Sequence, residues 1–275
     1  MSRVRETVAR GSTYAVLLLA AAAVLFPVYY ALAGSVMGVR ELAAYPPALV
    51  PRAPTLRNLT DVFTVIPLGR QYLNSAVVSG VITAAQLVTS ILAAYAFVFL
   101  PMRWRAAVFG LFLTTLMVPW EAVIIPNYLT VSSAGLANSY LGLVVPFLAS
   151  AFGTFLLRQA FLTFPTELRD AATVDGCGHW RFLWRILVPL NKPALAALAV
   201  YVFLSAWNQY FWPLIITRTP EMQTLQIGLS QLNNAEQADP GLILAGVTLS
   251  LLPTLLLVIF GQRFIVRGLT AGALR

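Results

Sequence analysis

Charged residues are scarce in this sequence, and their scarcity excludes most classes of soluble protein. Of 275 residues, 18 are Lys or Arg and 10 are Asp or Glu, so 10% of the chain is charged, whereas a soluble domain has about 25%. Apolar residues make up 59% of the chain, and the mean hydropathy is +0.79. A chain this apolar cannot stay solvated, which excludes intrinsic disorder. The composition predicts an integral membrane protein.

Lysine, histidine and cysteine occur once each, at Lys192, His179 and Cys177. No glycine-rich loop precedes Lys192, so the chain lacks the phosphate-binding loop with which many ATPases hold ATP. One histidine cannot form a paired-histidine metal site, and one cysteine cannot form an internal disulfide. A membrane enzyme would need a catalytic group that the sequence does not offer. We therefore expect no catalytic, metal or cofactor site in this chain.

Long uncharged stretches predict the transmembrane helices, since a span takes about 20 apolar residues. Four stretches, of 29, 32, 25 and 23 residues, fit one helix each. A fifth has 52 residues, interrupted only by Glu121; as one helix it would be about 78 Å long, so it must fold back at the polar residues 132–139. The sequence predicts an all-α protein with a single transmembrane domain, residues 1–275. Its six expected helices are 13–37, 71–100, 106–131, 139–159, 193–217 and 240–262.

Basic residues set the expected orientation. Thirteen Lys or Arg residues fall on the side of the N-terminus and five on the other side, which the positive-inside rule assigns to cytoplasm and exterior. Both termini and the loop 160–192 are thus expected in the cytoplasm. Because the net charge of +8 is spread over short loops and tails, it gives no sign of nucleic-acid binding. The apolar run from Tyr14 is longer than a signal-peptide core, so the first helix is expected to remain uncleaved.

The outer segments are expected to be irregular. Four prolines, Pro46, Pro47, Pro51 and Pro54, precede the second helix and argue for extended chain rather than helix. The stretch from Arg218 to Asp239 is expected to be a polar loop.

The inner loop 160–192 carries the most informative pattern. Pro165 suits the first turn of a short helix, and Gly176 suits its end. Between them, Leu168, Ala171, Ala172 and Asp175 share one face, because they follow the helical spacing. A second amphipathic piece, 180–187, follows at once, closed by two prolines. Helix chemistry alone leaves two partners open for this loop, the lipid surface and another protein.

A longer motif passes through this loop at fixed spacing. Asp170-Ala171-Ala172 is followed after three residues by Gly176, after nine more by Ile186, and then by Pro189. The chain here resembles the inner-membrane permeases of ATP-binding cassette importers, whose motif E-A-A-x-x-x-G-x(9)-I-x-L-P docks onto the ATPase. Asp170 replaces Glu and Val188 replaces Leu. The resemblance implies a cytoplasmic coupling helix between helices four and five. Its implied docking residues are Glu167, Asp170, Ala171, Ala172, Asp175, Gly176, Ile186 and Pro189.

Other short stretches resemble the same family, within its carbohydrate-importer branch. They are 72–75, 94–96, 207–210 and 267–272, together with Pro119 and Pro126. The chain looks most similar to the second permease of glycerol-3-phosphate or glycerophosphodiester importers, with maltose-type permeases close behind. The resemblance implies a bacterial cytoplasmic membrane, a homologous second permease, an extracytoplasmic solute-binding protein or lipoprotein, and two ATPase subunits that hold ATP and Mg.

Polar and aromatic residues within the expected helices are candidates for the solute path. They are Asn74, Glu121, Trp207, Asn208, Gln209 and Tyr210. Each has a structural alternative: a hydrogen bond beside Pro119 for Glu121, core or belt packing for the aromatic rings, and helix-to-helix bonding for the amides. A carboxylate in the path would repel a glycerol phosphate, so a neutral sugar stays open as the solute. A self-contained secondary transporter is the contrasting class, and it would have no use for an ATPase-docking loop.

Overall fold

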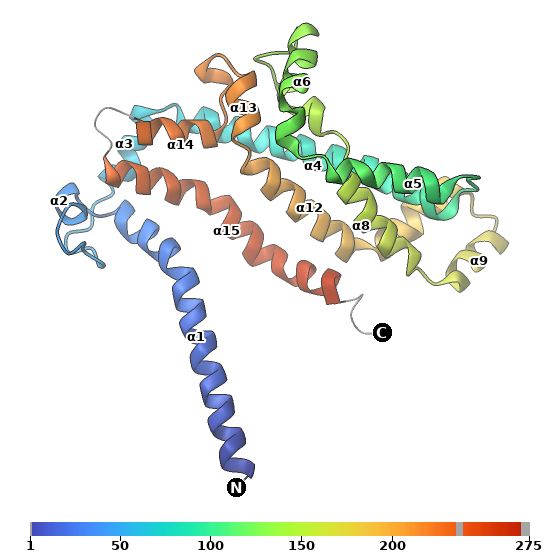
Figure 1. Cartoon of the computed structure of the whole chain (residues 1–275), viewed down its shortest axis with the longest axis horizontal. Helices are drawn as coiled ribbons and strands as arrows, with labels where there is room; N and C mark the ends of the chain where they lie inside the picture. The colour runs from blue at the N-terminus through green and yellow to red at the C-terminus, as the bar shows by residue number, and fades with distance from the viewer. Residues whose placement is uncertain (1, 235–238, 271–275) are drawn as a thin grey trace. The chain divides into compact units, whose positions relative to one another are not determined.

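The computed structural model describes residues 2–234 and 239–270, and over these ranges every regular element is a helix. The chain forms two compact units. One comprises Met1–Leu68 and Gly228–Leu252, the other Gly69–Ile227 and Pro253–Arg275. Figure 1 labels the helices.

The first unit is built around α1 (Ser2–Ser35), which starts earlier than the expected residue 13 because no proline interrupts the basic N-terminal stretch. The end of α1 is fixed by Asn58, whose Nδ2 donates to the carbonyls of Ser35, at 3.2 Å, and Met37, at 2.8 Å. The start of α15 (Pro240–Thr270) lies beside α1, since Thr248 donates to the Ala31 carbonyl at 2.9 Å.

The outer segment expected to be irregular contains two helices, α2 (Val39–Leu42) and α3 (Arg57–Val65). This prediction was therefore wrong in part. The four prolines all lie between the two helices, and α3 carries none of them, so that nothing prevents its backbone bonds. Val62 on α3 is fully buried and marks the face of this helix that packs inward.

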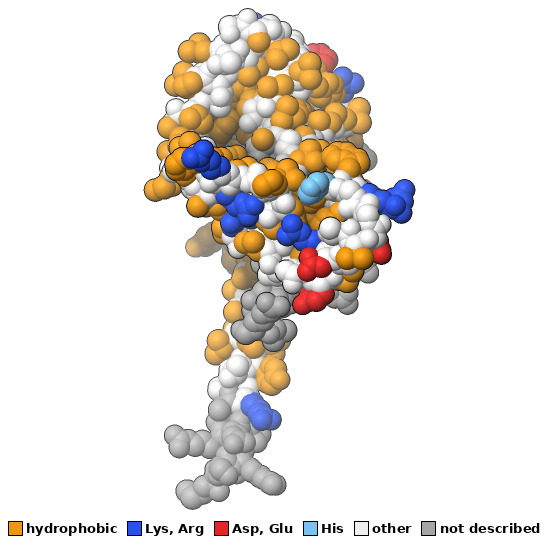
Figure 2. All heavy atoms as spheres, turned by 90° about the vertical axis from the view of Figure 1, so that its right-hand side faces the viewer, with side chains coloured by type: hydrophobic (Ala, Val, Ile, Leu, Met, Phe, Trp, Pro, Cys, Tyr) orange, Lys and Arg blue, Asp and Glu red, His pale blue; other side chains and the backbone are white. Residues whose placement is uncertain are grey.

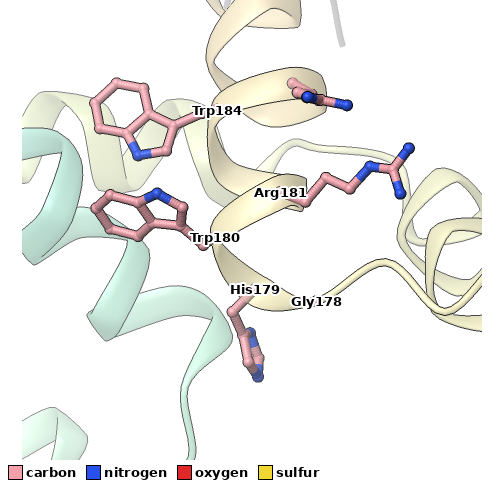
Figure 3. Close-up of a pocket in the computed structure, with 6 residues that line it drawn as sticks. Gly178, His179, Trp180, Arg181 and Trp184 are labelled. Atoms are coloured by element: carbon pink, nitrogen blue, oxygen red, sulfur yellow. The ribbon is translucent and has the colours of Figure 1, made fainter.

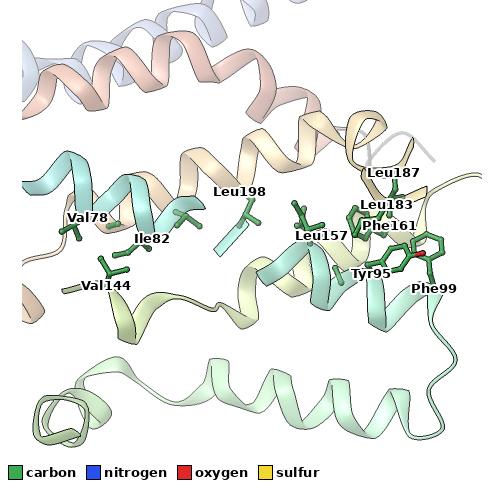
Figure 4. Packing of buried hydrophobic residues seen from close by; sticks show 14 of the residues in the cluster. Val78, Ile82, Tyr95, Phe99, Val144, Leu157, Phe161, Leu183, Leu187 and Leu198 are labelled. Atoms are coloured by element: carbon green, nitrogen blue, oxygen red, sulfur yellow. The ribbon is translucent and has the colours of Figure 1, made fainter. Parts of the chain in front are cut away.

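The second unit is organised along α4 (Leu68–Phe99), which matches the expected helix 71–100 within a few residues. Val78, Ile82, Ile91, Tyr95 and Phe99 are buried on it. Val78 and Ile82 share one face of α4, and Ile91, Tyr95 and Phe99 share another, because four residues make about one helical turn whereas nine make about two and a half. These side chains pack against those of other elements that are distant in sequence, among them Val144, Leu157, Leu183 and Leu198 (Figure 4).

The expected helix 106–131 is broken into α5 (Arg105–Thr114), the 3-10 turn Thr115–Met117 and α6 (Trp120–Ser133). The two halves meet at 95°. Val118 and Pro119 are extended, with ψ of 115° and 138°, because a proline disfavours helical backbone at the residue before it. The expectation of one unbroken helix over 106–131 was therefore wrong, although Pro119 lies within that range.

The expected helix 139–159 is likewise two pieces, α7 (Tyr140–Val144) with the turn Val145–Phe147, and α8 (Ala151–Leu162), at 48° to each other. Pro146 has no N–H to donate to the Gly142 carbonyl four residues earlier. The indole Nε1 of Trp212 donates to that carbonyl instead, at 3.1 Å. Ser150 then caps α8 by accepting from the Gly153 amide at 3.2 Å.

The expected helix 193–217 is also interrupted, into α12 (Lys192–Trp207) and α13 (Phe211–Ile216). Pro213 cannot donate to the Gln209 carbonyl, so a continuous helix would lose a bond there. The polar outer loop contains the turn Pro220–Met222 and α14 (Leu225–Asn234), a helix that the sequence analysis missed. The last expected helix, 240–262, is confirmed as part of α15.

Within the described residues, three helices are long and apolar enough to cross a membrane by themselves, Arg10–Ser35, Leu68–Phe99 and Pro240–Gln262. Three bent pairs pass the same test together, so up to six spans are available. Much of this surface is apolar and exposed; Leu18, Leu19 and Val24 on α1 are each more than 70% accessible. Apolar side chains also cover much of the face seen in Figure 2.

Candidate functional site

The inner loop folds into a short helix with a defined start and end. This helix, α9, spans Thr166–Val174, with Pro165 at its N-cap rather than in its first turn. At its end the Cys177 amide donates to the Ala172 carbonyl, at 2.9 Å, and the Gly176 amide to that of Thr173, at 3.1 Å. Gly176 has φ +68°. This pair of bonds around a left-handed glycine is the Schellman motif, so the expected glycine stop is confirmed.

The surface of α9 divides into an anchored side and an exposed side. Ala172 is buried, and the Arg169 guanidinium lies 5.4 Å from the centre of the Phe99 ring at the end of α4. The other expected contact residues face away from the chain's own core. Glu167, Leu168, Asp170, Ala171 and Asp175 are exposed. Figure 2 shows acidic side chains beside basic ones at this end of the second unit.

Ala172 does not lie on the exposed contact face that was expected for it. The spacing grouped Ala172 with Leu168, Ala171 and Asp175 on one contact face, but only Ala172 is buried within this subunit. The small side chain lets α9 approach its own chain closely, whereas the exposed Ala171 leaves the backbone open to another surface.

A hydrogen bond ties the second part of the loop to α4. This part comprises α10 (His179–Phe182), a π-helical turn (Leu183–Leu187) and α11 (Val188–Leu190). His179 Nδ1 lies 2.7 Å from the Tyr95 hydroxyl oxygen, and the two rings meet edge to face at 6.0 Å. Tyr95 is buried on α4. Tyr95 belongs to the stretch 94–96 that resembles the permease family, and His179 is the single histidine, but nothing in the sequence indicates that the two meet.

A small hollow of about 250 Å³ lies between this hydrogen bond and α9. It is lined by Tyr95, Phe99, Arg169, Ala172, Thr173, Cys177, Gly178, His179 and Phe182. Aromatic rings of Phe99 and Phe182 meet beside it at 5.5 Å. The inner loop is thus held to the end of α4 by one hydrogen bond, one cation–ring contact and packed rings.

The remaining motif residues lie where the loop meets the core. Ile186 and Pro189 are half-buried, and Leu183 and Leu187 beside them are fully buried. Pro189 has no N–H to donate to the Arg185 carbonyl, and the π-helical turn Leu183–Leu187 lies directly before it. Among the described residues, no group of acidic, histidine or cysteine side chains is arranged to hold a metal ion.

The candidate path residues do not form one cluster. Asn74 is fully buried and fully bonded: its Nδ2 donates to the Glu221 and Gln223 carbonyls, at 2.8 Å each, and its Oδ1 accepts from the Tyr140 hydroxyl at 2.6 Å. This geometry is that of a structural clamp. It joins α4 to α7 and to the segment that precedes α14.

Trp207 is buried at the end of α12, with its ring 5.2 Å from Tyr72 and 5.8 Å from Phe203. Core packing therefore accounts for its position.

Asn208, Gln209 and Tyr210 form the non-helical link between α12 and α13. Asn208 is exposed and accepts from Gln226 at 3.3 Å, while Gln209 Oε1 is buried with no hydrogen-bond partner among the described residues. Breaks in membrane helices expose backbone polar groups, which are tolerated where they line a cavity or lie within protein.

Glu121 lies in the first turn of α6 and is exposed. Its carboxylate makes no hydrogen bond or ion pair with any described residue of the chain. The alternative of a structural hydrogen bond beside Pro119 is thus not realised within this chain.

The clamp at Asn74 has neighbours that the sequence analysis missed. Ser75 accepts the Leu225 amide at 2.9 Å. Gln71, one turn earlier on α4, is fully buried, yet both its amide atoms lack a partner among the described residues, as does the buried Thr224 hydroxyl. Unpaired buried groups cost free energy, so Gln71 and Thr224 do not stabilise the attachment of residues 221–225 to α4. The hydrogen bonds of Asn74 and Ser75 therefore contribute much of that attachment.

Comparison with known proteins agrees with these features. The family model described as "Binding-protein-dependent transport system inner membrane component" matches residues 86–271. The "sn-glycerol-3-phosphate transport system permease protein UgpE" of Yersinia pestis is 37% identical over 254 residues, 90% of each chain. Its namesake from Agrobacterium fabrum is 35% identical over 271 residues, 95% of this chain and 96% of that one.

The fold is shared with a solved structure. A chain from the crystal structure of a bacterial ABC transporter involved in the import of the acidic polysaccharide alginate superposes with a TM-score of 0.83. The two are 23% identical, and the match covers 94% of this chain and 97% of the other. From the family match and the relatives' identity, the chain belongs to the inner-membrane permease components of binding-protein-dependent transport systems.

Proposed function

We propose that this chain forms half of the translocation path of an ATP-binding cassette importer for glycerol-3-phosphate or a glycerophosphodiester-like solute. The observation that carries this proposal is 37% identity over 90% of the chain to a permease named for sn-glycerol-3-phosphate transport. A homologous second permease would supply the other half of the path, and a solute-binding protein would deliver the solute from outside.

In this proposal the chain crosses the bacterial cytoplasmic membrane six times. Three spans are the long helices, two are the bent pairs α5 with α6 and α7 with α8, and the sixth is α12 with α13. The breaks in the last three bring backbone polar groups into the membrane region. Both termini and the inner loop lie in the cytoplasm, as the thirteen-to-five distribution of basic residues favours.

Coupling to ATP hydrolysis is assigned to the exposed side of α9. Ala171, Asp170 and Glu167 face away from the chain, while Arg169 and Ala172 hold the helix to α4. ATP and Mg²⁺ would be held by two partner ATPases, whose closure moves α9 and, through its anchors, α4. The path would then switch because the contact energy with the ATPases differs between the two states.

Solute uptake tests the proposal directly. We expect cells that produce the complete importer to accumulate labelled sn-glycerol-3-phosphate, and an excess of unlabelled glycerophosphodiester to compete while maltose does not. Competition by maltose alone would show a neutral-sugar importer. Uptake that persists without any ATPase subunit would show a self-contained carrier.

A substitution on α9 tests the coupling surface. Ala171→Arg places a long cation on the exposed side, and we expect loss of solute-stimulated ATP hydrolysis and of uptake while the permease still inserts. Ala134→Arg is the matched control, since Ala134 is exposed at the end of α6, on the proposed outer side. Equal activity of both variants would contradict a docking role for α9.

A further inference from the structure

The segment His179–Leu190 lies almost at a right angle to the apolar helix that follows it. It meets α12, Lys192–Trp207, at 79°. Membrane helices are tilted by about 20° on average, so a segment at this angle to a membrane-crossing α12 runs nearly along the bilayer surface. The two prolines at 189 and 193 make the turn, because neither can continue the backbone bonding of the helix.

The side chains of this segment are sorted as on a helix that rests on a membrane. Trp180 and Trp184 lie on one side with their rings 5.8 Å apart, and Arg181 extends from the other side (Figure 3). Leu183 and Leu187 are buried against the core and fix the segment's orientation. Tryptophan is enriched at membrane–water interfaces, because its ring has an apolar body and a polar N–H.

A wide hollow of about 830 Å³ runs between these side chains. It is lined by Gly178, His179, Trp180, Arg181, Trp184 and Arg185. Trp180 is 67% exposed, so its ring packs only partly against the described chain.

The charge of the segment is of one sign. No acidic residue occurs between Asp175 and Glu221, while Arg181, Arg185 and Lys192 all fall within this interval. Among the described residues, none of these three cations takes part in an ion pair. A guanidinium group binds phosphate oxygens through two parallel hydrogen bonds, so the two arginines suit a phosphate that arrives from outside the chain.

We propose that His179–Leu190 binds the headgroup of an anionic phospholipid in the cytoplasmic leaflet, with Arg181 and Arg185 at the phosphate and the two tryptophans at the boundary with the acyl chains. The neighbouring α9 carries Glu167 and Asp170 against one cation, Arg169, and Asp175 caps its end, so that its net charge is negative. The negative surface of that leaflet attracts the basic segment and repels the acidic helix. Lipid binding would therefore hold α9 away from the membrane, where a cytoplasmic partner can reach it.

The test uses the full-length chain, purified in mild detergent and titrated with phosphatidylglycerol or phosphatidylcholine, with bound lipid counted by native mass spectrometry. We expect the wild-type chain to prefer phosphatidylglycerol. Arg181→Gln/Arg185→Gln should weaken that binding on the order of tenfold, because each basic residue near an anionic surface contributes to binding. Arg40→Gln/Arg52→Gln removes two exposed arginines on the proposed outer side and should leave it unchanged.

Three results would overturn the proposal. The first is full phosphatidylglycerol binding by the Arg181/Arg185 variant. The second is displacement of the lipid by soluble sn-glycerol-3-phosphate, which would make the hollow a site for a free phosphate. The third is displacement by the purified partner ATPase, which would make the segment a protein contact. The lipid titration needs no transport, so its failure leaves the proposed solute and coupling untouched.

Discussion

The hydrogen bond between Tyr95 and His179 joins a long apolar helix to the loop that carries α9. At 2.7 Å it lies beside Arg169 and Phe99, so both parts of the inner loop are attached to the same end of α4. Tyr95→Phe removes the hydroxyl and keeps the ring. We expect a loss of about 1 kcal/mol in the free energy of unfolding, seen as a fall of about 2 °C in the unfolding temperature.

The control for Tyr95 is Tyr201→Phe, because Tyr201 is exposed on α12 and packs its ring on Phe152. We expect this variant to unfold at the wild-type temperature and to keep wild-type ATP turnover in the importer, whereas Tyr95→Phe lowers the solute transported per ATP hydrolysed. Identical behaviour of the two variants would show that the Tyr95–His179 bond transmits nothing.

Asn74 shows how a single polar side chain can be a clamp. Its three hydrogen bonds reach Tyr140 and the carbonyls of Glu221 and Gln223. Asn74→Ala removes all three bonds and should cost about 2–3 kcal/mol, while Tyr140→Phe removes one bond and should cost about 1 kcal/mol. Trypsin cleavage after the exposed Arg218 measures release of the segment. The prediction fails when both variants are cut as slowly as the wild type.

At the scale of single elements, the end of α9 depends on one backbone conformation. Gly176 has φ +68° with no atom close to the position of a Cβ, so a substitution there is opposed by the backbone alone. Gly176→Ala should destabilise the end of the helix by about 1 kcal/mol. Hydrogen exchange at the Gly176 and Cys177 amides, both bonded to α9 carbonyls, should then become faster.

Gly178→Ala is the matched control for Gly176. Gly178 is two residues away, has φ −69° and likewise has open space around it. We expect exchange at the same amides to stay at the wild-type rate in this variant. If Gly178→Ala accelerated exchange as much as Gly176→Ala does, the left-handed backbone would not be what ends α9.

The elements differ in how far the sequence could predict them. Helix α4 follows from the uncharged stretch 71–102, whose one proline, Pro101, lies just beyond the end of the helix, and α9 follows from the proline and glycine at its ends. The breaks in the helices at 106–131, 139–159 and 193–217 were missed. A proline inside an apolar run is compatible with both a kink and a break, and contacts such as Trp212 with the Gly142 carbonyl decide between them.

Of the candidate site, the sequence could predict the positions along α9 but not the contacts between residues that are distant in sequence. The motif spacing located the exposed residues of α9. That Ala171 is exposed while Ala172 is buried depends on the position of α4, and the spacing of the motif carries no information about that position. The Tyr95–His179 bond joins residues 84 positions apart. Asn74 was expected in the solute path, and the structure places it in a clamp because its partners come from segments 66 to 149 positions away.

At the scale of the whole molecule, the orientation of the chain in the membrane can be tested with one cysteine at a time. In a Cys177→Ser background, Val174→Cys places a thiol on α9, at a side chain 89% exposed, and Ser133→Cys places one at the end of α6. The proposed topology puts these positions on opposite sides of the membrane.

We expect an impermeant maleimide to label Val174→Cys in inverted membrane vesicles and not in intact spheroplasts, and Ser133→Cys in spheroplasts and not in inverted vesicles. The physical reason is the basic-residue bias, which holds thirteen of eighteen cations on the cytoplasmic side. Labelling of both positions from the cytoplasmic side would mean that α7 with α8, the helices between them, does not cross the membrane. The six-span topology would then be wrong, and α5 with α6 would form a re-entrant hairpin at the bend of 95°.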